Sequence, residues 1–167
     1  MLNTFFFFRH GVTSFNKEKK YTGHQDISLS SSAYEEIKNT LPLLKNKNIT
    51  IVYSSPLLRA QQTAKIIANY LNISIVIVDE FKERNFGLFE GKKKLQYNKK
   101  CFPKGQTLYR YKRQVLRGLK KIKIDNNSLI VAHSGTFKIL HKYYYGFNFK
   151  NRIRNNELIY FEQSQEL

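Results

Sequence analysis

Two histidines, two arginines and a glutamate have the side chains that phosphoryl transfer requires. His10 directly follows Arg9 and precedes a glycine, Arg59 and Glu83 follow in the first half of the chain, and His133 lies near its end. A neutral imidazole can attack phosphorus and carry the phosphoryl group as a covalent intermediate. Guanidinium groups bind phosphoryl oxygens through paired hydrogen bonds and stabilise the charge that develops during transfer.

The remaining groups could supply proton transfer and anion binding. A carboxyl such as Glu83 can protonate the leaving oxygen and later remove a proton from water. A second imidazole, His133, can donate to another phosphoryl oxygen. Arginines beside a histidine lower its pKa and so keep it neutral. Helix N-termini expected at Ser55-Pro56 and at Gly135 would add backbone N–H donors for an anion.

Each of these residues alone also has a purely structural interpretation. His10 could be a hydrogen-bonded buried histidine, His133 a helix cap, Arg59 a surface arginine of a helix and Glu83 one more solvated charge. A metal site is the other alternative for the histidines, but only two further histidines exist, with no His-Glu-x-x-His pair and no cysteine cluster. We therefore expect no metal, and the phosphoryl-transfer hypothesis depends on the combination of residues.

An alternation of strands and helices is expected to position these side chains. Apolar and β-branched runs predict strands at residues 4–8, 49–53, 73–78, 128–132 and 158–161, and the third run is typical of a strand buried on both faces. Apolar stripes predict helices at residues 30–44, from Pro56 onwards, at 107–122 and at 136–145. A serine cluster is expected to cap the first helix and Ser55 the second, and Pro42 to disturb the last turn of the first.

This pattern predicts an α/β fold, a three-layer α/β/α sandwich around a mostly parallel sheet, in a single domain of residues 1–167. Ligands of open α/β sheets bind beyond the carboxyl ends of the strands. Arg9 and His10, the Ser54-Ser55-Pro56 segment with Arg59, the segment leading to Glu83, and His133 all follow expected strand ends. The topology therefore predicts that the five residues converge.

Length and composition exclude several classes of protein. A chain of 167 residues with 13 Phe and 11 Tyr is globular in composition, and its single cysteine, Cys101, cannot form an intrachain disulfide. No stretch approaches the 18 apolar residues of a membrane span. A collagen, a coiled coil, a disulfide scaffold and a membrane protein are therefore excluded, and a reducing, cytoplasmic location is expected.

Positive charge is concentrated in the second half of the chain. Residues 1–90 hold 11 basic and 8 acidic side chains, whereas residues 91–167 hold 18 basic and 4 acidic ones, out of a net charge of +17. Residues 91–124 contain 13 basic residues and no acidic one. Such a segment attracts phosphorylated substrates, nucleic acid or an acidic membrane surface, although a merely solvated basic face is an equally good explanation.

Taken in chain order, the motifs resemble those of the histidine phosphatase superfamily, which includes phosphoglycerate mutase, and in particular its small-molecule phosphatases. The matching segments are Arg9-His10-Gly11 with Asn16, Gly23-His24-Gln25-Asp26-Ile27-Ser28-Leu29, residues 53–64, residues 83–91 and Val131-Ala132-His133-Ser134-Gly135. They span residues 5–139, which is most of the chain.

The resemblance implies a phosphoglycerate mutase-like fold and a role for each residue. His10 would be the nucleophile that becomes phosphohistidine, and Glu83 would be the proton donor. The phosphate pocket would contain Arg9, Arg59 and His133, with Asn16, Ser134 and Gly135 as further contacts. No cofactor is implied, and the basic segment at about residues 91–124 would form a short cap over the site.

Three departures from the family pattern bear on the reaction. The segment between Gly91 and His133 is shorter than in mutases, which favours a phosphatase. Gln106 replaces a glutamate that many phosphatases carry, so we expect a charge near the pocket to be lost. Ser31-Ser32-Ala33 replaces the usual start of a helix, with no expected effect.

Three functional hypotheses follow. The first is a metal-independent phosphomonoesterase that acts on a small, multiply charged phosphorylated substrate. The second is a phosphoglycerate mutase. The third is a phosphate- or polyanion-binding protein of low turnover, with Tyr97, Tyr109 and Tyr111 stacking on nucleic-acid bases; nucleic-acid or membrane binding is not favoured, because no nucleic-acid motif is present. The natural substrate and the oligomeric state are left open by the sequence.

Overall fold

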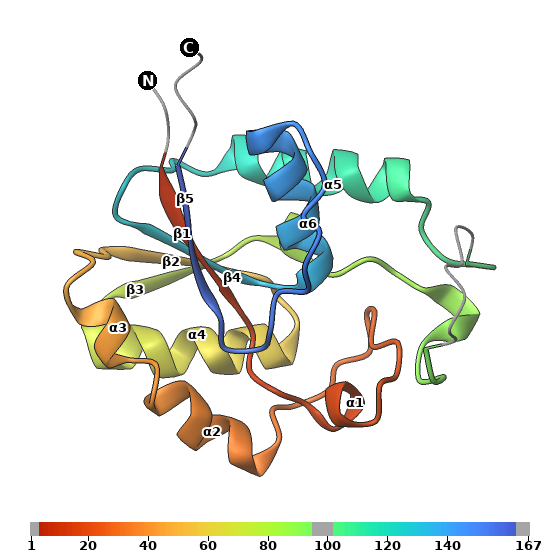
Figure 1. Ribbon diagram of the computed structural model, residues 1–167, viewed down its shortest axis with the longest axis horizontal. Coiled ribbons are helices and arrows are strands. Elements are labelled where there is room, and N and C mark those ends of the chain that lie inside the picture. Colours follow the sequence, from red (N-terminus) through yellow and green to blue (C-terminus); the bar gives the residue numbers. More distant parts are fainter. Residues whose placement is uncertain (1–3, 95–101, 163–167) are drawn as a thin grey trace.

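The computed structural model describes residues 4–94 and 102–162 (Figure 1). Cys101, Tyr97 and Lys99-Lys100 of the basic segment lie outside these described residues. No helix in the described ranges is long and apolar enough to cross a membrane.

A single five-stranded sheet in the order β3-β2-β4-β1-β5 forms the centre of the molecule. Its strands are β1 (Phe5–Arg9), β2 (Ile51–Ser54), β3 (Ser74–Ile77), β4 (Ser128–Ala132) and β5 (Leu158–Phe161). Strand β1 runs parallel to β4, β4 to β2 and β2 to β3, whereas β5 pairs antiparallel with β1. The predicted mostly parallel sheet is therefore confirmed, with one antiparallel edge strand.

Helices cover both faces of this sheet, which confirms the three-layer α/β/α sandwich (Figure 1). The helices are α1 (Ser14–Lys17), α2 (Ser31–Lys38), α3 (Pro42–Lys45), α4 (Leu58–Leu71), α5 (Leu108–Lys121) and α6 (Ser134–Tyr145), with short 3-10 turns η1 (Asp79–Phe81) and η2 (Gly87–Phe89). Helices α5 and α6 pack on one face, and α2, α3 and α4 on the other.

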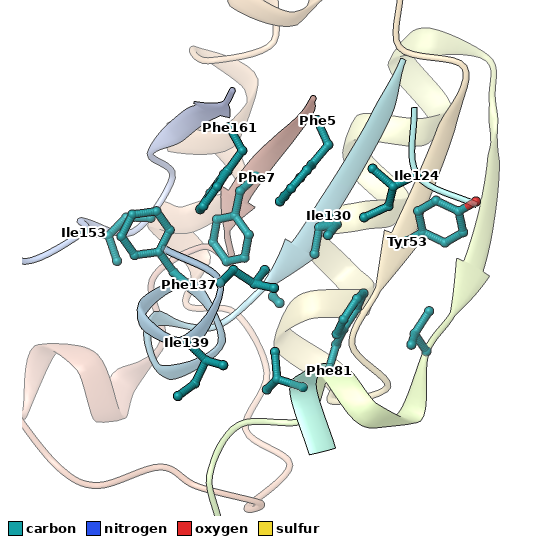
Figure 2. Close-up of a cluster of buried hydrophobic side chains, with 14 of the residues drawn as sticks. Phe5, Phe7, Tyr53, Phe81, Ile124, Ile130, Phe137, Ile139, Ile153 and Phe161 are labelled. Carbon is teal, nitrogen blue, oxygen red and sulfur yellow. The ribbon is translucent and has the colours of Figure 1, made fainter. Parts of the chain in front are cut away.

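The four phenylalanines at residues 5–8 connect the two cores because successive side chains of a strand point to opposite faces. Phe5 and Phe7 pack toward α5 and α6, where Figure 2 shows them beside Phe137 and Phe161. Phe6 and Phe8 pack toward α2 and α4. Strand β1 is consequently buried along its whole length. Its last residue, Arg9, lies at the sheet edge where ligands are expected.

The predicted helix at residues 30–44 is two helices rather than one. Helix α2 ends at Lys38, and Pro42 begins α3. Pro42 has no N–H to donate to the carbonyl of Lys38, so the α-helical hydrogen-bond pattern cannot continue through it. Ser30 occupies the N-cap position of α2, but its side chain makes no capping hydrogen bond, so the expected serine cap is wrong.

The prediction that residues 73–78 form a fully buried strand is also wrong. Strand β3 pairs only with β2 and forms an edge of the sheet, where 40% of Val76 and 46% of Ile77 are exposed. A β-branched run has the same pattern at an edge as in the centre, because the run reports strand preference and not the position of the strand in the sheet.

Candidate active site

The two histidines follow strands that are neighbours in the sheet. The N–H of His10 donates to the carbonyl of Ala132 at 3.0 Å, which continues the parallel pairing of β1 with β4. The imidazole rings of His10 and His133 consequently lie 5.1 Å apart between centroids. Residues 123 positions apart in the sequence are thus brought together by one strand pairing.

His10 is held as a neutral imidazole with one nitrogen available. Its side chain is 4% exposed, and Nδ1 lies 2.7 Å from the carbonyl oxygen of Gly11. A carbonyl only accepts, so Nδ1 carries the proton and Nε2 carries the lone pair. Burial lowers the pKa of His10 well below 6.5, and the positive charges of Arg59 and Arg9 lower it further.

Arg9 and Arg59 are buried cations whose side chains are fixed by backbone carbonyls. Arg9 Nη1 donates to Ile153 O at 2.7 Å, and Arg59 donates through its two Nη atoms to Gln25 O and Gly23 O, each at 2.9 Å. Burial lowers the pKa of each to about 10, so both remain charged at neutral pH. The Nε atom of each is buried and has no hydrogen-bond partner among the described residues.

His133 has a third buried ring or guanidinium nitrogen without a partner among the described residues. Its Nε2 lies 2.7 Å from Ser55 Oγ. The Ser55 hydroxyl accepts from the N–H of Leu57 and can donate to Nε2, an arrangement in which the imidazole proton lies on Nδ1. Nδ1 is buried and has no partner in the described part of the chain. Burial, followed by the charge of Arg59, lowers the pKa of His133 well below 6.5.

The expected N-cap role of Ser55 is wrong. Helix α4 begins at Leu58 with Leu57 in the cap position, and the N–H of Leu58 donates to Asp26 Oδ1 at 2.6 Å. A carboxylate 32 positions earlier in the chain thus caps the helix that carries Arg59. Helix α6 likewise begins two residues earlier than predicted, at Ser134, with His133 in its N-cap position.

Glu83, which is 8% exposed, is held by three hydrogen-bond donors. Its Oε1 accepts from the N–H of Arg84 and from the hydroxyl of Tyr111, both at 2.9 Å. Its Oε2 accepts from the N–H of Gly135 at 3.1 Å. The Gly135 N–H, which the sequence predicts to donate to a bound anion, therefore donates to the carboxyl group of Glu83 instead. A Cβ atom at Gly135 would lie 2.0 Å from Glu83 Oε1, so a larger residue there would displace the Glu83 carboxyl group.

A cavity of about 50 Å³ lies beside Arg9, His10, Arg59 and Glu83, whereas the predicted site residues His133 and Gly135 are not among the residues that line it. It is lined by the predicted residues Arg9, His10, Asn16, Arg59, Glu83 and Ser134 and by four residues that the sequence did not single out, Thr22, Gly23, Phe86 and Lys94. Lys94 is the member of the cationic run 92–94 that lines it. Gly23 and Phe86 belong to segments that match the family motifs, so their place in those segments was a usable signal, whereas Thr22 carried none.

Gln106 lies away from this cavity, contrary to the expectation of a lost charge near the pocket. Its side chain donates to Gln114 Oε1 at 2.9 Å, and its backbone carbonyl accepts from Arg84 Nε at 2.8 Å. Gln106 therefore links α5 to the segment that carries Glu83.

A larger cavity of about 710 Å³ runs along α5 and reaches Tyr143 of α6. Its charged lining residues are all cationic, namely Arg110, Arg113, Arg117 and Lys120. The expected stacking role of Tyr111 is wrong, because Tyr111 is 1% exposed, whereas Tyr109 is 68% exposed. In residues 4–94 and 102–162, no group of three or more His, Cys, Asp or Glu side chains lies close enough to hold a metal ion.

Comparison with known proteins places this chain in a family. A family model described as histidine phosphatase superfamily (branch 1) matches residues 5–158. The chain is 34% identical over 139 residues to the uncharacterized phosphatase PhoE of Bacillus subtilis. This alignment covers 79% of the chain and 72% of PhoE.

It is also 38% identical over 107 residues to a 2,3-bisphosphoglycerate-dependent phosphoglycerate mutase of Buchnera aphidicola, over 61% of this chain and 46% of the mutase. A protein of Escherichia coli that is provisionally described as an alpha-ribazole-5'-P phosphatase has the same fold in its crystal structure. It superposes with a TM-score of 0.86 at 22% identity and covers 99% of this chain and 92% of that one.

Proposed function

The chain belongs to the histidine phosphatase superfamily, branch 1, and from this premise we propose that it is a phosphatase that hydrolyses phosphomonoesters through a phosphohistidine on His10, without a metal. The observation that carries the proposal is a neutral His10 whose Nδ1 is engaged and whose Nε2 is available. Close to it, Arg9 Nε, Arg59 Nε and His133 Nδ1 are buried without a hydrogen-bond partner among the described residues. Buried N–H groups are normally paired. Phosphoryl oxygens would satisfy all three.

In the first half-reaction, His10 Nε2 attacks phosphorus and forms the P–N bond. The bond between phosphorus and the ester oxygen breaks, and the protonated carboxyl of Glu83 transfers its proton to that oxygen. Arg9, Arg59 and the Nδ1–H of His133 donate to the phosphoryl oxygens and stabilise their charge, which grows in the transition state. The products are the alcohol, phosphohistidine and the Glu83 carboxylate.

In the second half-reaction, water attacks the phosphorus of phosphohistidine. The Glu83 carboxylate removes a proton from that water, the P–N bond breaks, and Nε2 recovers its electron pair. Inorganic phosphate leaves, and Glu83 is again protonated. Asn16 and Ser134, which line the same cavity, would hold the phosphate during both steps.

Hydrolysis is favoured over a mutase reaction because the segment between Gly91 and His133 is short. The similarity to PhoE supports this choice, since it extends over 72% of that phosphatase but only 46% of the Buchnera mutase. Phosphoglycerate mutase activity is the second candidate, and it predicts isomerisation of 3-phosphoglycerate stimulated by a bisphosphoglycerate.

The substrate is proposed to be small and to carry negative charge in addition to its phosphoryl group. Lys94 lines the cavity, and desolvation, followed by the charge of Arg152, lowers the pKa of its ammonium group. Arg152 also lowers the pKa of Arg9, so these cations act on one another. A carboxylate or second phosphate on the substrate would relieve their repulsion.

The proposal includes a single cytoplasmic domain of residues 1–167. Of the basic cap expected at about residues 91–124, Lys94 lines the cavity, whereas helix α5 packs on the sheet. Binding of a polyanion with little turnover is the alternative that the cationic cavity along α5 supports. Such binding would weaken steeply with salt.

The first prediction tests the reaction itself. Wild-type protein should hydrolyse p-nitrophenyl phosphate between pH 5 and 8 with EDTA present, and His10→Ala should lose this activity by a factor of about 10³ or more, because the nucleophile is absent. Rapid quenching in alkali should trap an acid-labile phosphoprotein in wild type and not in His10→Ala. Retained hydrolysis in His10→Ala would contradict a phosphohistidine mechanism.

A further inference from the structure

The two oxygens of Glu83 are in different hydrogen-bonding environments. Oε1 accepts from the Arg84 N–H and from the Tyr111 hydroxyl, whereas Oε2 accepts only from the Gly135 N–H. A carboxylate oxygen has two lone pairs in the plane of the group. Both lone pairs of Oε1 are thus engaged, and one lone pair of Oε2 is left for a proton.

Tyr111 is placed rigidly enough to impose this difference. It lies on α5 and is 1% exposed, and its hydroxyl is also 3.0 Å from Thr136 Oγ1. One turn further along α5, Gln114 Nε2 donates to the carbonyls of Glu80 and Lys82, just before Glu83 in the chain. Gly118 allows close approach, since a Cβ atom there would lie 2.7 Å from Glu80 Cβ.

Tyr111 also keeps its own proton throughout the working pH range. Burial and the negative charge of Glu83 raise its pKa well above 10, so its hydroxyl is present as a donor wherever Glu83 titrates. The hydroxyl of Thr136 contributes no charge. Helix α5 therefore presents a permanent neutral donor to one oxygen of the carboxyl group.

We propose that Tyr111 is a positioning residue that directs the transferable proton of Glu83 to Oε2. This inference rests on the proposed function, in which Glu83 gives a proton to the leaving oxygen and then takes one from water. By occupying Oε1, Tyr111 leaves a single site for both transfers. Loss of the hydroxyl frees a lone pair on Oε1, so that part of the protein carries the proton on the wrong oxygen.

Removal of the hydroxyl also changes the pH at which Glu83 gains its proton. The charged and titratable groups that face Glu83 from other elements are Arg9, Arg59, Lys94 and His24, whose Nε2 lies 2.8 Å from the Glu83 carbonyl. All of them remain in Tyr111→Phe, which removes only the neutral donor. The ionised carboxylate loses a hydrogen bond that favours it over the protonated form, so protonation in the variant should move to higher pH.

The test compares Tyr111→Phe with Tyr53→Phe. Tyr53 is a matched control because it is buried in the same core cluster and donates its hydroxyl to the carbonyl of Lys123, away from Glu83. In Tyr111→Phe, kcat/KM should fall about ten-fold for an alkyl ester such as glycerol 2-phosphate, whose leaving oxygen needs the proton. It should fall far less for p-nitrophenyl phosphate, whose leaving group needs little help. The alkaline limb of the alkyl-ester profile should move upward.

A second readout needs no turnover. The ¹³Cδ resonance of Glu83 reports the protonation of its carboxyl group, and its midpoint should move upward in Tyr111→Phe and stay in place in Tyr53→Phe. An unchanged midpoint, or equal losses for both esters, would overturn the proposal. If Tyr111→Phe does not fold, Thr136→Val, which removes the group that the Tyr111 hydroxyl contacts, should shift the midpoint in the same direction by a smaller amount, and no shift would again overturn it.

Failure of the proposed function has a different signature. In that case wild type forms no phosphohistidine, while the midpoint of Glu83 still differs between Tyr111→Phe and wild type. Failure of the positioning role leaves phosphohistidine formation intact and the midpoint unchanged.

Discussion

At the scale of single residues, the candidate site is held in place mainly by the backbone. Carbonyl groups fix Arg9, His10 and Arg59, and backbone N–H groups fix Glu83. Backbone partners do not rotate as long side chains do, so the reactive atoms are ordered before a substrate binds. In the described part of the chain, Arg9 Nε and Arg59 Nε are buried N–H donors without a partner, which favours binding of an anion beside them.

The state of His10 is a prediction at this scale. An ordinary imidazole is half protonated at about pH 6.5. Burial and the two arginines lower the pKa of His10, so its ring gains a second proton only at a pH well below 6.5. Long-range ¹H–¹⁵N spectra at pH 6.5 should show the neutral tautomer protonated on Nδ1. His10→Asn assigns the signal by its disappearance. A half-protonated ring, or a proton on Nε2, would contradict the arrangement.

At the scale of elements, the ends of strands and the starts of helices carry the site. Strands β1, β2 and β4 end at the same edge, which places Arg9, Ser55 and His133 there. Helix α4 has Arg59 as its second residue, so the position of that guanidinium depends on how the helix begins. Asp26 determines that start by accepting from the Leu58 N–H, and its charge suits the positive end of a helix.

Asp26→Ala should therefore weaken both the fold and the site. The loss of a capping acceptor lowers the free energy of unfolding by about 1 kcal/mol, as measured by urea denaturation. KM for p-nitrophenyl phosphate should rise, because the first turn of α4 holds Arg59. Asp26→Asn is the control, since an asparagine can still cap and should retain most of the stability. Equal losses in the two variants would show that charge, and not capping, is the important property of Asp26.

At the scale of the whole molecule, most of the positive charge lies outside the site, although Arg9, Arg59 and Lys94 line its cavity. The cations along α5 line a separate cavity of about 710 Å³, and Arg117 and Lys121 both contact Glu80 in the segment before Glu83. The cationic side chains of these pairs are exposed, whereas Glu80 is buried. Their summed field, within a net charge of +17, attracts anions toward the protein.

This field predicts a salt-dependent rate. With increasing NaCl, kcat/KM should fall while kcat stays nearly constant, because screening weakens the attraction between protein and substrate and not the chemical step. The slope should be steeper for a substrate with a second phosphate than for a monophosphate. Lys94→Gln should bring the two slopes closer together, since Lys94 lines the cavity. Identical slopes in wild type would contradict a contribution of the basic surface to substrate capture.

The sequence by itself determined the elements and the chemistry of the site. Periodicity and residue type predicted the five strands and the helix faces, because local preference and alternation depend on neighbours within a few positions. The rule that ligands bind at the carboxyl ends of parallel strands predicted that His10, His133, Arg9, Arg59 and Glu83 converge. In the structure Arg9, His10, Arg59 and Glu83 line one cavity, and His133 lies beside His10. Motif order indicated the family.

The tertiary structure alone decided which distant groups touch. Ser55 contacts His133 across 78 positions, Asp26 caps a helix 32 positions away, and Tyr111 reaches Glu83 across 28. Such contacts depend on the order of strands in the sheet and on how α5 lies over it. A local pattern records that Tyr111 faces inward and that residues 74–77 form a strand. It does not record that a carboxylate lies opposite the tyrosine or that the strand is at an edge, because both follow from packing between segments remote in the chain.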